Sequence, residues 1–125
     1  MTLRQRQPRI EDAKHLAWIR TLPCLVTGKT GDIHAAHIRF ASVKYNKRQT
    51  GIGEKSSDCW VVPLNANLHL NGQHREGERT WWFSLGIDPL KAAQRLYSLS
   101  GKTQKAIEFM DKARRVSVIN TSADR

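Results

Sequence analysis

Residues 34–39 of this chain read H-A-A-H-I-R, residues 58–64 read D-x-W-x-V-P-L, and residues 69–74 read H-x4-H. Four of the five histidines in the sequence fall within these motifs, around a short apolar run. A neutral imidazole can ligate a metal ion or accept a proton near pH 7. The pattern therefore indicates one small metal site. The fifth histidine, His15, lies upstream in a segment with helical periodicity.

The chain is strongly basic, with 21 Lys and Arg against 11 Asp and Glu, and its net charge is +10 over 125 residues. Such a charge attracts polyanions, so nucleic acid is the leading class of partner. A hydrophobic fraction of 39% suffices for one modest core, and we expect a single domain over residues 10–116. Residues 1–9 are expected to be a flexible basic arm, able to lie on phosphates, and residues 117–125 a disordered tail.

Nothing in the sequence predicts export or a membrane span. The first twenty residues mix arginines with acids, and no later run approaches the roughly 20 apolar residues of a spanning helix. Cys24 and Cys59 are too few for a disulfide framework, so the expected setting is a reducing cytoplasm. We expect both cysteines to be small buried side chains.

The pattern of apolar residues predicts an α+β domain. A helix is expected over residues 10–22, where Pro23 ends it. Residues 24–28 and 33–38 are short β-type runs on either side of a turn-rich link, which predicts a hairpin. A basic loop at 39–57 and a brief apolar run follow. Further helices are predicted over residues 76–84, 89–99 and 103–115.

The motifs together resemble the HNH nuclease superfamily, and within it small phage and prophage proteins of the recombination-enhancement type. The resemblance covers roughly residues 22–99 and rests on the order and spacing of P-C-L-V-T-G (23–28), A-A-H-I-R (35–39), G-x-G-E-K-x-S-D-x-W-x-V-P-L (51–64), H-x4-H (69–74) and G-I-D-P (86–89). It implies a small ββα-metal (HNH/His-Me finger) core with an N-terminal helix and C-terminal helices. It also implies a metal-dependent DNA endonuclease or nickase, working in phage or prophage DNA recombination in the bacterial cytoplasm.

The resemblance implies a role for several site residues. His37 matches the superfamily's general base, an imidazole that takes a proton from water as the water attacks a phosphodiester. His69 and His74 match the later histidines that ligate the metal. An asparagine in the middle of the motif orients the base in this superfamily, and either Asn65 or Asn67 is placed for that role.

Two positions depart from the superfamily pattern. Ala36 stands where many relatives have a metal-binding Asp or His, so the first-strand ligand stays open. His34 can replace it only if the strand bends, because residues three apart in a regular strand point to opposite faces. Asp32 is a weaker substitute. Thr27 stands where many relatives have the second cysteine of a zinc knuckle, and we predict no knuckle.

The spacing of His69 and His74 predicts a break between them. Residues five apart are separated by about 140° around an α-helix, so the two imidazoles cannot share one helical face. Asn71-Gly72 lies between them and is a turn signal. We expect His69 in a loop or helix end and His74 after a turn.

The resemblance further implies a divalent cation and DNA contacts. Mg²⁺ or Mn²⁺ would be ordinary for this chemistry, while imidazole-rich ligation also suits Zn²⁺ or Ni²⁺. The DNA can be duplex or single-stranded, and a recombinase filament is a further candidate partner. Phosphates are expected to contact five cations that follow the His37 strand: Arg39, Lys44, Lys47, Arg48 and Lys55.

Other residues have structural interpretations, and other functions stay open. Asp58 is expected to hydrogen-bond the loop backbone near the site. Trp81, Trp82 and Phe83 cannot share one helix face, so at least one is expected in the core while another can stack on a base. One alternative, favoured by Ala36, is a non-catalytic DNA-binding recombination accessory protein with a degenerate metal site. A second is an RNA-binding protein without a metal site.

Overall fold

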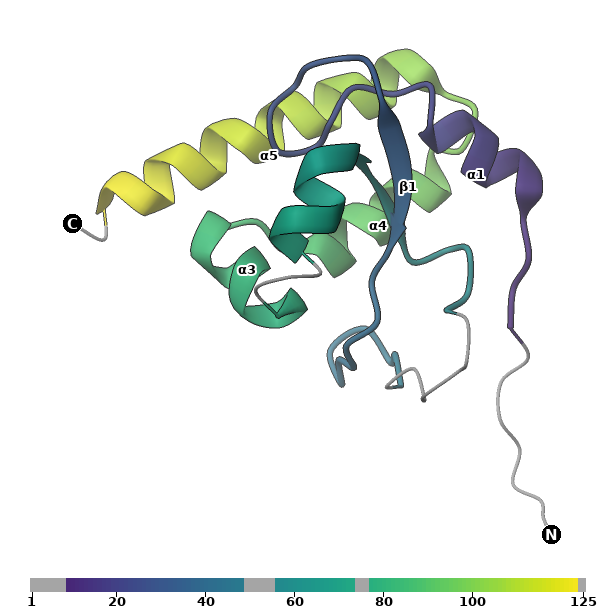
Figure 1. Cartoon of the computed structure of the whole chain (residues 1–125), viewed down its shortest axis with the longest axis horizontal. Coiled ribbons are helices and arrows are strands. Elements are labelled where there is room, and N and C mark those ends of the chain that lie inside the picture. The colour runs from purple at the N-terminus through teal and green to yellow at the C-terminus, as the bar shows by residue number, and fades with distance from the viewer. Residues whose placement is uncertain (1–8, 49–55, 74–76, 124–125) are drawn as a thin grey trace, which may run out of the picture.

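The structure is a computed structural model that describes residues 9–48, 56–73 and 77–123, with side chains as far as residue 116. Its centre is a two-stranded antiparallel sheet of β1 (Ile33–His37) and β2 (Val61–Asn65). Ile33 lies opposite Asn65, and His37 lies opposite Val61. Helices surround this sheet, as Figure 1 shows, so the expected α+β class is confirmed at this level.

The partner of β1 differs from the sequence-based prediction. The sequence predicts a hairpin between residues 24–28 and 33–38, and this prediction is wrong, because β1 pairs with β2. They form a turn in which Gly28, at φ 75°, donates its N–H to the Cys24 carbonyl at 2.8 Å. Leu25 donates to the Pro63 carbonyl at 2.9 Å, so the turn lies alongside β2. These residues form a turn despite their β-propensity, because Gly28 tolerates the positive φ that the hydrogen bond to Cys24 requires.

Five helical segments surround the strands in the described part of the chain. They are α1 (Ala13–Ile19), η1 (Leu68–Gln73), α3 (Glu78–Leu85), α4 (Pro89–Ser98) and α5 (Thr103–Ala123). The start of α4 is as predicted, because the Asp88 carboxylate accepts the N–H groups of Leu90 and Lys91. The helix predicted over 103–115 continues to Ala123, through most of the segment expected to be a disordered tail. None of the helices in the described ranges is both long and apolar enough to cross a membrane.

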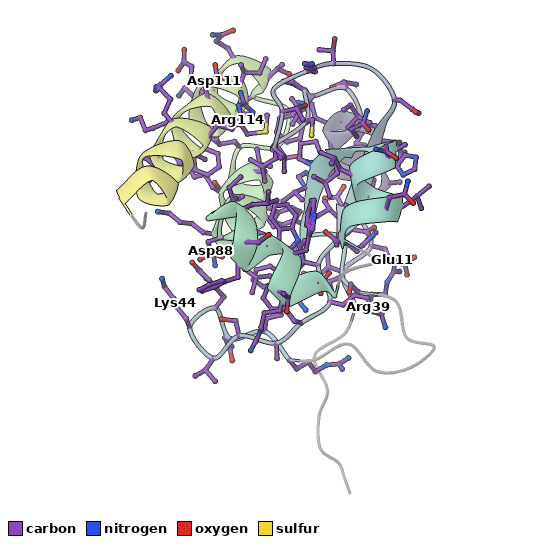
Figure 2. The ribbon with its side chains drawn as sticks, turned by 60° about the vertical axis from the view of Figure 1, so that its left-hand side comes forward. Glu11, Arg39, Lys44, Asp88, Asp111 and Arg114 are labelled. Atoms are coloured by element: carbon purple, nitrogen blue, oxygen red, sulfur yellow. The ribbon has the colours of Figure 1, made fainter. Side chains whose placement is uncertain are left out.

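One apolar core joins the sheet to the helices. Both strands, α1, α3, α4 and α5 each contribute an apolar side chain at most 1% exposed, such as Leu64 of β2, Trp82 of α3, Leu96 of α4 and Met110 of α5. Polar contacts also attach α5, because the Arg114 guanidinium donates to the carbonyls of the 24–28 turn at 3.0 and 3.1 Å (Figure 2). Cys24 is buried as expected, whereas Cys59 is half-buried.

The helical segment η1 is a π-helical turn that follows β2 closely. Asn71 and Gly72 both lie inside it, so the turn predicted at this dipeptide is wrong. Glycine is needed here for a different reason, because a Cβ at position 72 would lie 2.6 Å from Trp81 Nε1. Single π-helical turns are rare and are often found at functional sites. This one carries His69.

Candidate active site

His37 is the last residue of β1, and its side chain is 32% exposed. Its Nε2 lies 2.9 Å from Oδ1 of Asp58, whose side chain is 4% exposed. Because a carboxylate only accepts hydrogen bonds, Nε2 carries the proton in this contact. The lone pair of the neutral ring is then on Nδ1, which no hydrogen bond engages among the described residues. The imidazole is thus held at one nitrogen and available as a proton acceptor at the other.

Asp58 is fixed by residues from the start of the chain. Its Oδ2 accepts the backbone N–H of Asp12 at 2.8 Å, and its Oδ1 lies 3.3 Å from the Arg9 guanidinium. Burial raises the pKa of the Asp58 carboxyl, but hydrogen bonds from Asp12 and His37 and the charges of His37 and Arg9 outweigh it. The net pKa is below its ordinary value. Asp58 is therefore ionised near neutral pH. Arg9, expected in the flexible arm, is anchored here, and residues 1–8 lie outside the described residues.

Asp58→Asn is expected to destabilise the fold by about 1–3 kcal/mol at pH 7, because buried donors lose a charged acceptor. The pKa of Asp58 is lower in the folded state than in the unfolded chain, where it is about 3.9. The ionised carboxylate therefore stabilises the fold above that unfolded value, and the stabilisation is lost as the pH falls through the lower folded value. Urea midpoints of wild type and variant should therefore differ fully at pH 7 and converge below about pH 4. A difference that stays constant into acid would contradict this account.

A pair of imidazoles joins the same strand to η1. His34 Nδ1 of β1 and His69 Nδ1 of η1 are 3.0 Å apart, and the two rings meet edge to face at 89°. In this contact one ring donates an N–H and the other accepts it. Two nitrogens that ligate one ion at about 2.0–2.1 Å each also lie about 3 Å apart, so an ion that displaced this proton could take both imidazoles as ligands. Asp32, the weaker candidate, instead offers its backbone carbonyl to the N–H of Ala66. His74 lies outside the described residues.

The two histidines of β1 engage separate partners. β1 is regular over Ile33–His37, and His34 and His37 reach η1 and Asp58 respectively. Ala36 between them is fully buried in the core and offers no ligand. Within the described ranges, no three His, Cys, Asp or Glu side chains converge as a metal site.

Neither asparagine expected to orient His37 does so in the described part of the chain. Asn65 Oδ1 accepts the N–H of Asn67 at 2.9 Å, and Asn67 Oδ1 accepts from the Asn71 amide, so both side chains stabilise the start of the segment that holds η1. The orienting residue is Asp58. The sequence predicted that Asp58 bonds the loop backbone, whereas its backbone partner is Asp12 before α1, and its contact with His37 was not predicted.

Gln73 supports His37 from the other side, and sequence reasoning missed it. Its side chain is 1% exposed, and its Nε2 donates to the His37 carbonyl at 3.3 Å. Its Oε1 accepts the indole N–H of Trp82 at 2.9 Å. This chain of bonds connects α3, η1 and the end of β1. No local signal marks Gln73, because its role depends on packing between three elements.

Glu78 fixes the backbone as it leaves β1. Its carboxylate accepts the N–H groups of Arg39 and Phe40 at 2.9 to 3.0 Å. Of the predicted phosphate-binding cations, Arg39, Lys44 and Arg48 are exposed, and Lys55 lies outside the described residues. Lys47 differs. It is 8% exposed, its ammonium donates to the carbonyls of Arg39 and Arg48, and burial lowers its pKa. Lys47 therefore stabilises the loop.

Comparisons of the chain with protein-family models, with curated proteins and with solved structures found no match. Any functional assignment therefore depends on the motifs and on the geometry of the site.

Proposed function

We propose that this chain is a metal-dependent DNA endonuclease or nickase of the HNH type, acting in phage or prophage recombination. The observation that carries the proposal is the His37–Asp58 pair. It combines a half-exposed imidazole at a strand end with a buried carboxylate of lowered pKa, 2.9 Å away. Such a pairing orients an imidazole as a general base and stabilises the imidazolium that it becomes.

In the proposed reaction, His37 Nδ1 takes a proton from water as the water oxygen attacks the phosphorus. A new P–O bond forms, one ester P–O bond breaks, and the leaving oxygen takes a proton from solvent. Asp58 keeps its negative charge throughout and stabilises the protonated ring. Gln73 and Glu78 hold the backbone on either side of the base, so the ring is positioned before substrate arrives.

His34 and His69 would hold the metal ion, because their Nδ1 atoms lie 3.0 Å apart and both could bind one ion once the proton between them is displaced. His34 and His37 point to opposite faces of the regular strand β1, so the cation would neutralise charge on the phosphate backbone from the face opposite the base. Imidazole ligands favour Zn²⁺ or Ni²⁺ over Mg²⁺ and Mn²⁺, which prefer oxygen ligands.

His34→Ala and His69→Ala are each expected to weaken binding of Zn²⁺ or Ni²⁺ by more than about tenfold, since even outer-shell changes at metal sites cost 10- to 100-fold. Isothermal titration calorimetry of the purified protein measures this. The matched control is His37→Ala, which removes an imidazole committed to Asp58 and should leave metal affinity unchanged. Equal affinity in His34→Ala and wild type would contradict the assignment.

DNA is the proposed substrate because exposed cations follow the base strand on a chain of net charge +10. Contacts made mainly to phosphates carry little sequence information, so low sequence specificity is expected.

A second function has one specific observation in its favour. Ala36 is fully buried where the superfamily has a metal ligand. This favours a non-catalytic DNA-binding accessory protein of recombination that retains the fold without the full metal shell.

One assay separates the two functions. Purified protein is incubated with supercoiled, linear and single-stranded DNA in Mg²⁺, Mn²⁺ or Zn²⁺, and in EDTA. Nicking that requires a metal and stops in EDTA supports the nuclease. Tight, salt-sensitive binding without cleavage in any metal overturns it and favours the accessory protein.

A further inference from the structure

Phe83 is the most exposed aromatic side chain of helix α3. Trp81 and Trp82 before it are 6% and 1% exposed, whereas Phe83 is 87% exposed. Arg79, one helical turn earlier on the same face, is also exposed. A single exposed apolar side chain is common in proteins. Whether the exposed Phe83 ring is a binding site therefore depends on the residues around it.

The loop that follows β1 is attached to α3 and its C-terminal end. The Arg79 guanidinium donates to the Ala41 carbonyl at 3.0 Å and lies 5.1 Å from the Phe40 ring centroid. At the other end, the Tyr45 hydroxyl donates to Asp88 at 2.7 Å. The loop and the exposed face of α3 therefore form one continuous surface, and Figure 2 shows Lys44 of this loop on the same side as Asp88.

The carboxylates of this surface are occupied, while several of its cations face solvent. Glu78 accepts backbone N–H groups of the loop, and Asp88 accepts the Tyr45 hydroxyl and two backbone N–H groups of α4. Lys44 and Lys91 are exposed beside them. Phe83 thus lies one helical turn from Arg79, and exposed Lys44 lies on the loop that contacts both Arg79 and Asp88.

We infer that this surface binds an unpaired stretch of DNA, with a base stacked on Phe83 and phosphates near Lys44 and Arg79. The inference rests on the proposed function for its choice of DNA and extends it by naming the single strand. Aromatic rings beside cationic grooves are the recurrent way in which proteins hold single strands, because every unpaired base has a flat face to stack. In a duplex those faces are covered by neighbouring base pairs, and the ring of Phe83 has nothing to stack on.

The test measures binding of a fluorescent single-stranded oligonucleotide and of its duplex, in EDTA so that cleavage does not interfere. Phe83→Ala is expected to weaken single-strand binding by about tenfold, the scale of one lost base stack, and to leave duplex binding unchanged. Phe83→Trp should bind as wild type does, and Phe83→Leu should be as weak as the alanine variant. Val116→Ala on α5 removes another exposed apolar side chain, 50% exposed, and should change nothing.

The outcomes separate this inference from the proposed function. Wild-type affinity in Phe83→Leu would overturn stacking, because leucine has no flat ring for a base to stack on. Equal losses on single strand and duplex would overturn the preference for unpaired DNA. Lys44→Gln should reduce the slope of log affinity against log salt by about one, and an unchanged slope counts against the phosphate contact. Because EDTA removes catalysis from the assay, these results stand whether or not the protein nicks DNA.

Discussion

His37→Ala is expected to lower the rate of metal-dependent DNA nicking by about 10²- to 10⁴-fold, the contribution of a positioned general base. The loss should appear in the chemical step, because the exposed cations that would bind DNA are unchanged. Single-turnover nicking of supercoiled plasmid at saturating protein measures the rate, and a filter-binding assay measures DNA affinity. The variant should bind DNA and metal as the wild type does.

Two controls test the role of the imidazole. Added free imidazole should restore part of the activity of His37→Ala, because the missing group is a proton acceptor in a half-exposed site. The variant should be less stable by about 1–3 kcal/mol, because the buried Asp58 carboxylate loses a donor, so its melting curve must show that it is folded at the assay temperature. A variant that nicks at the wild-type rate would mean that the base lies elsewhere.

The helices could be predicted because their signals are local. Asp88 and Pro89 start α4 as the sequence indicates, and the Asp88 side chain caps the first turn. Asp12 caps α1 in the same way through the N–H of His15. Each signal lies within a few residues of the bond that it forms, so no knowledge of the tertiary fold is needed.

The sheet and the base's partner could not be predicted because both depend on distant residues. β1 pairs with β2, and only this pairing places His37 opposite Val61 and brings Asp58, three residues before Val61, beside the imidazole. Once the pairing is assumed to be local, as with residues 24–28, Asp58 has no reason to meet His37. The roles of Asn65 and Asn67 were implied by the resemblance alone, and their side-chain oxygens instead accept from Asn67 and Asn71 respectively.

At two further positions, Gly72 and Lys47, packing in the folded protein gives the residue a different role from the one that the local sequence indicates. Asn71-Gly72 is a turn signal, but the glycine is required by the close approach of Trp81. Lys47 reads as a surface cation, but its ammonium is taken up by loop carbonyls. Trp81 is nine residues from Gly72 and Arg39 is eight from Lys47, so neither contact can be read from the residues around the signal.

The fold around the site depends most on Trp82. Trp82→Ala is expected to lower the free energy of unfolding by about 3–5 kcal/mol, the usual cost of deleting a buried large aromatic ring. Trp82 is 1% exposed, and the deletion also leaves the buried Gln73 carbonyl without its donor. Since small domains have about 5–15 kcal/mol in total, much of the stability would be lost. Urea unfolding followed by circular dichroism measures the change.

Trp82→Phe separates the ring from its N–H. Phenylalanine keeps most of the apolar volume but cannot donate to Gln73 Oε1, so a smaller loss of about 1–3 kcal/mol is expected. The freed Gln73 side chain would hold the His37 carbonyl less firmly. Nicking should therefore slow, although Trp82 itself contacts none of the three histidines of the site. If Trp82→Phe lost stability but nicked at the full wild-type rate, the Gln73 bridge would be structural alone and His37 would be positioned by Asp58 without it.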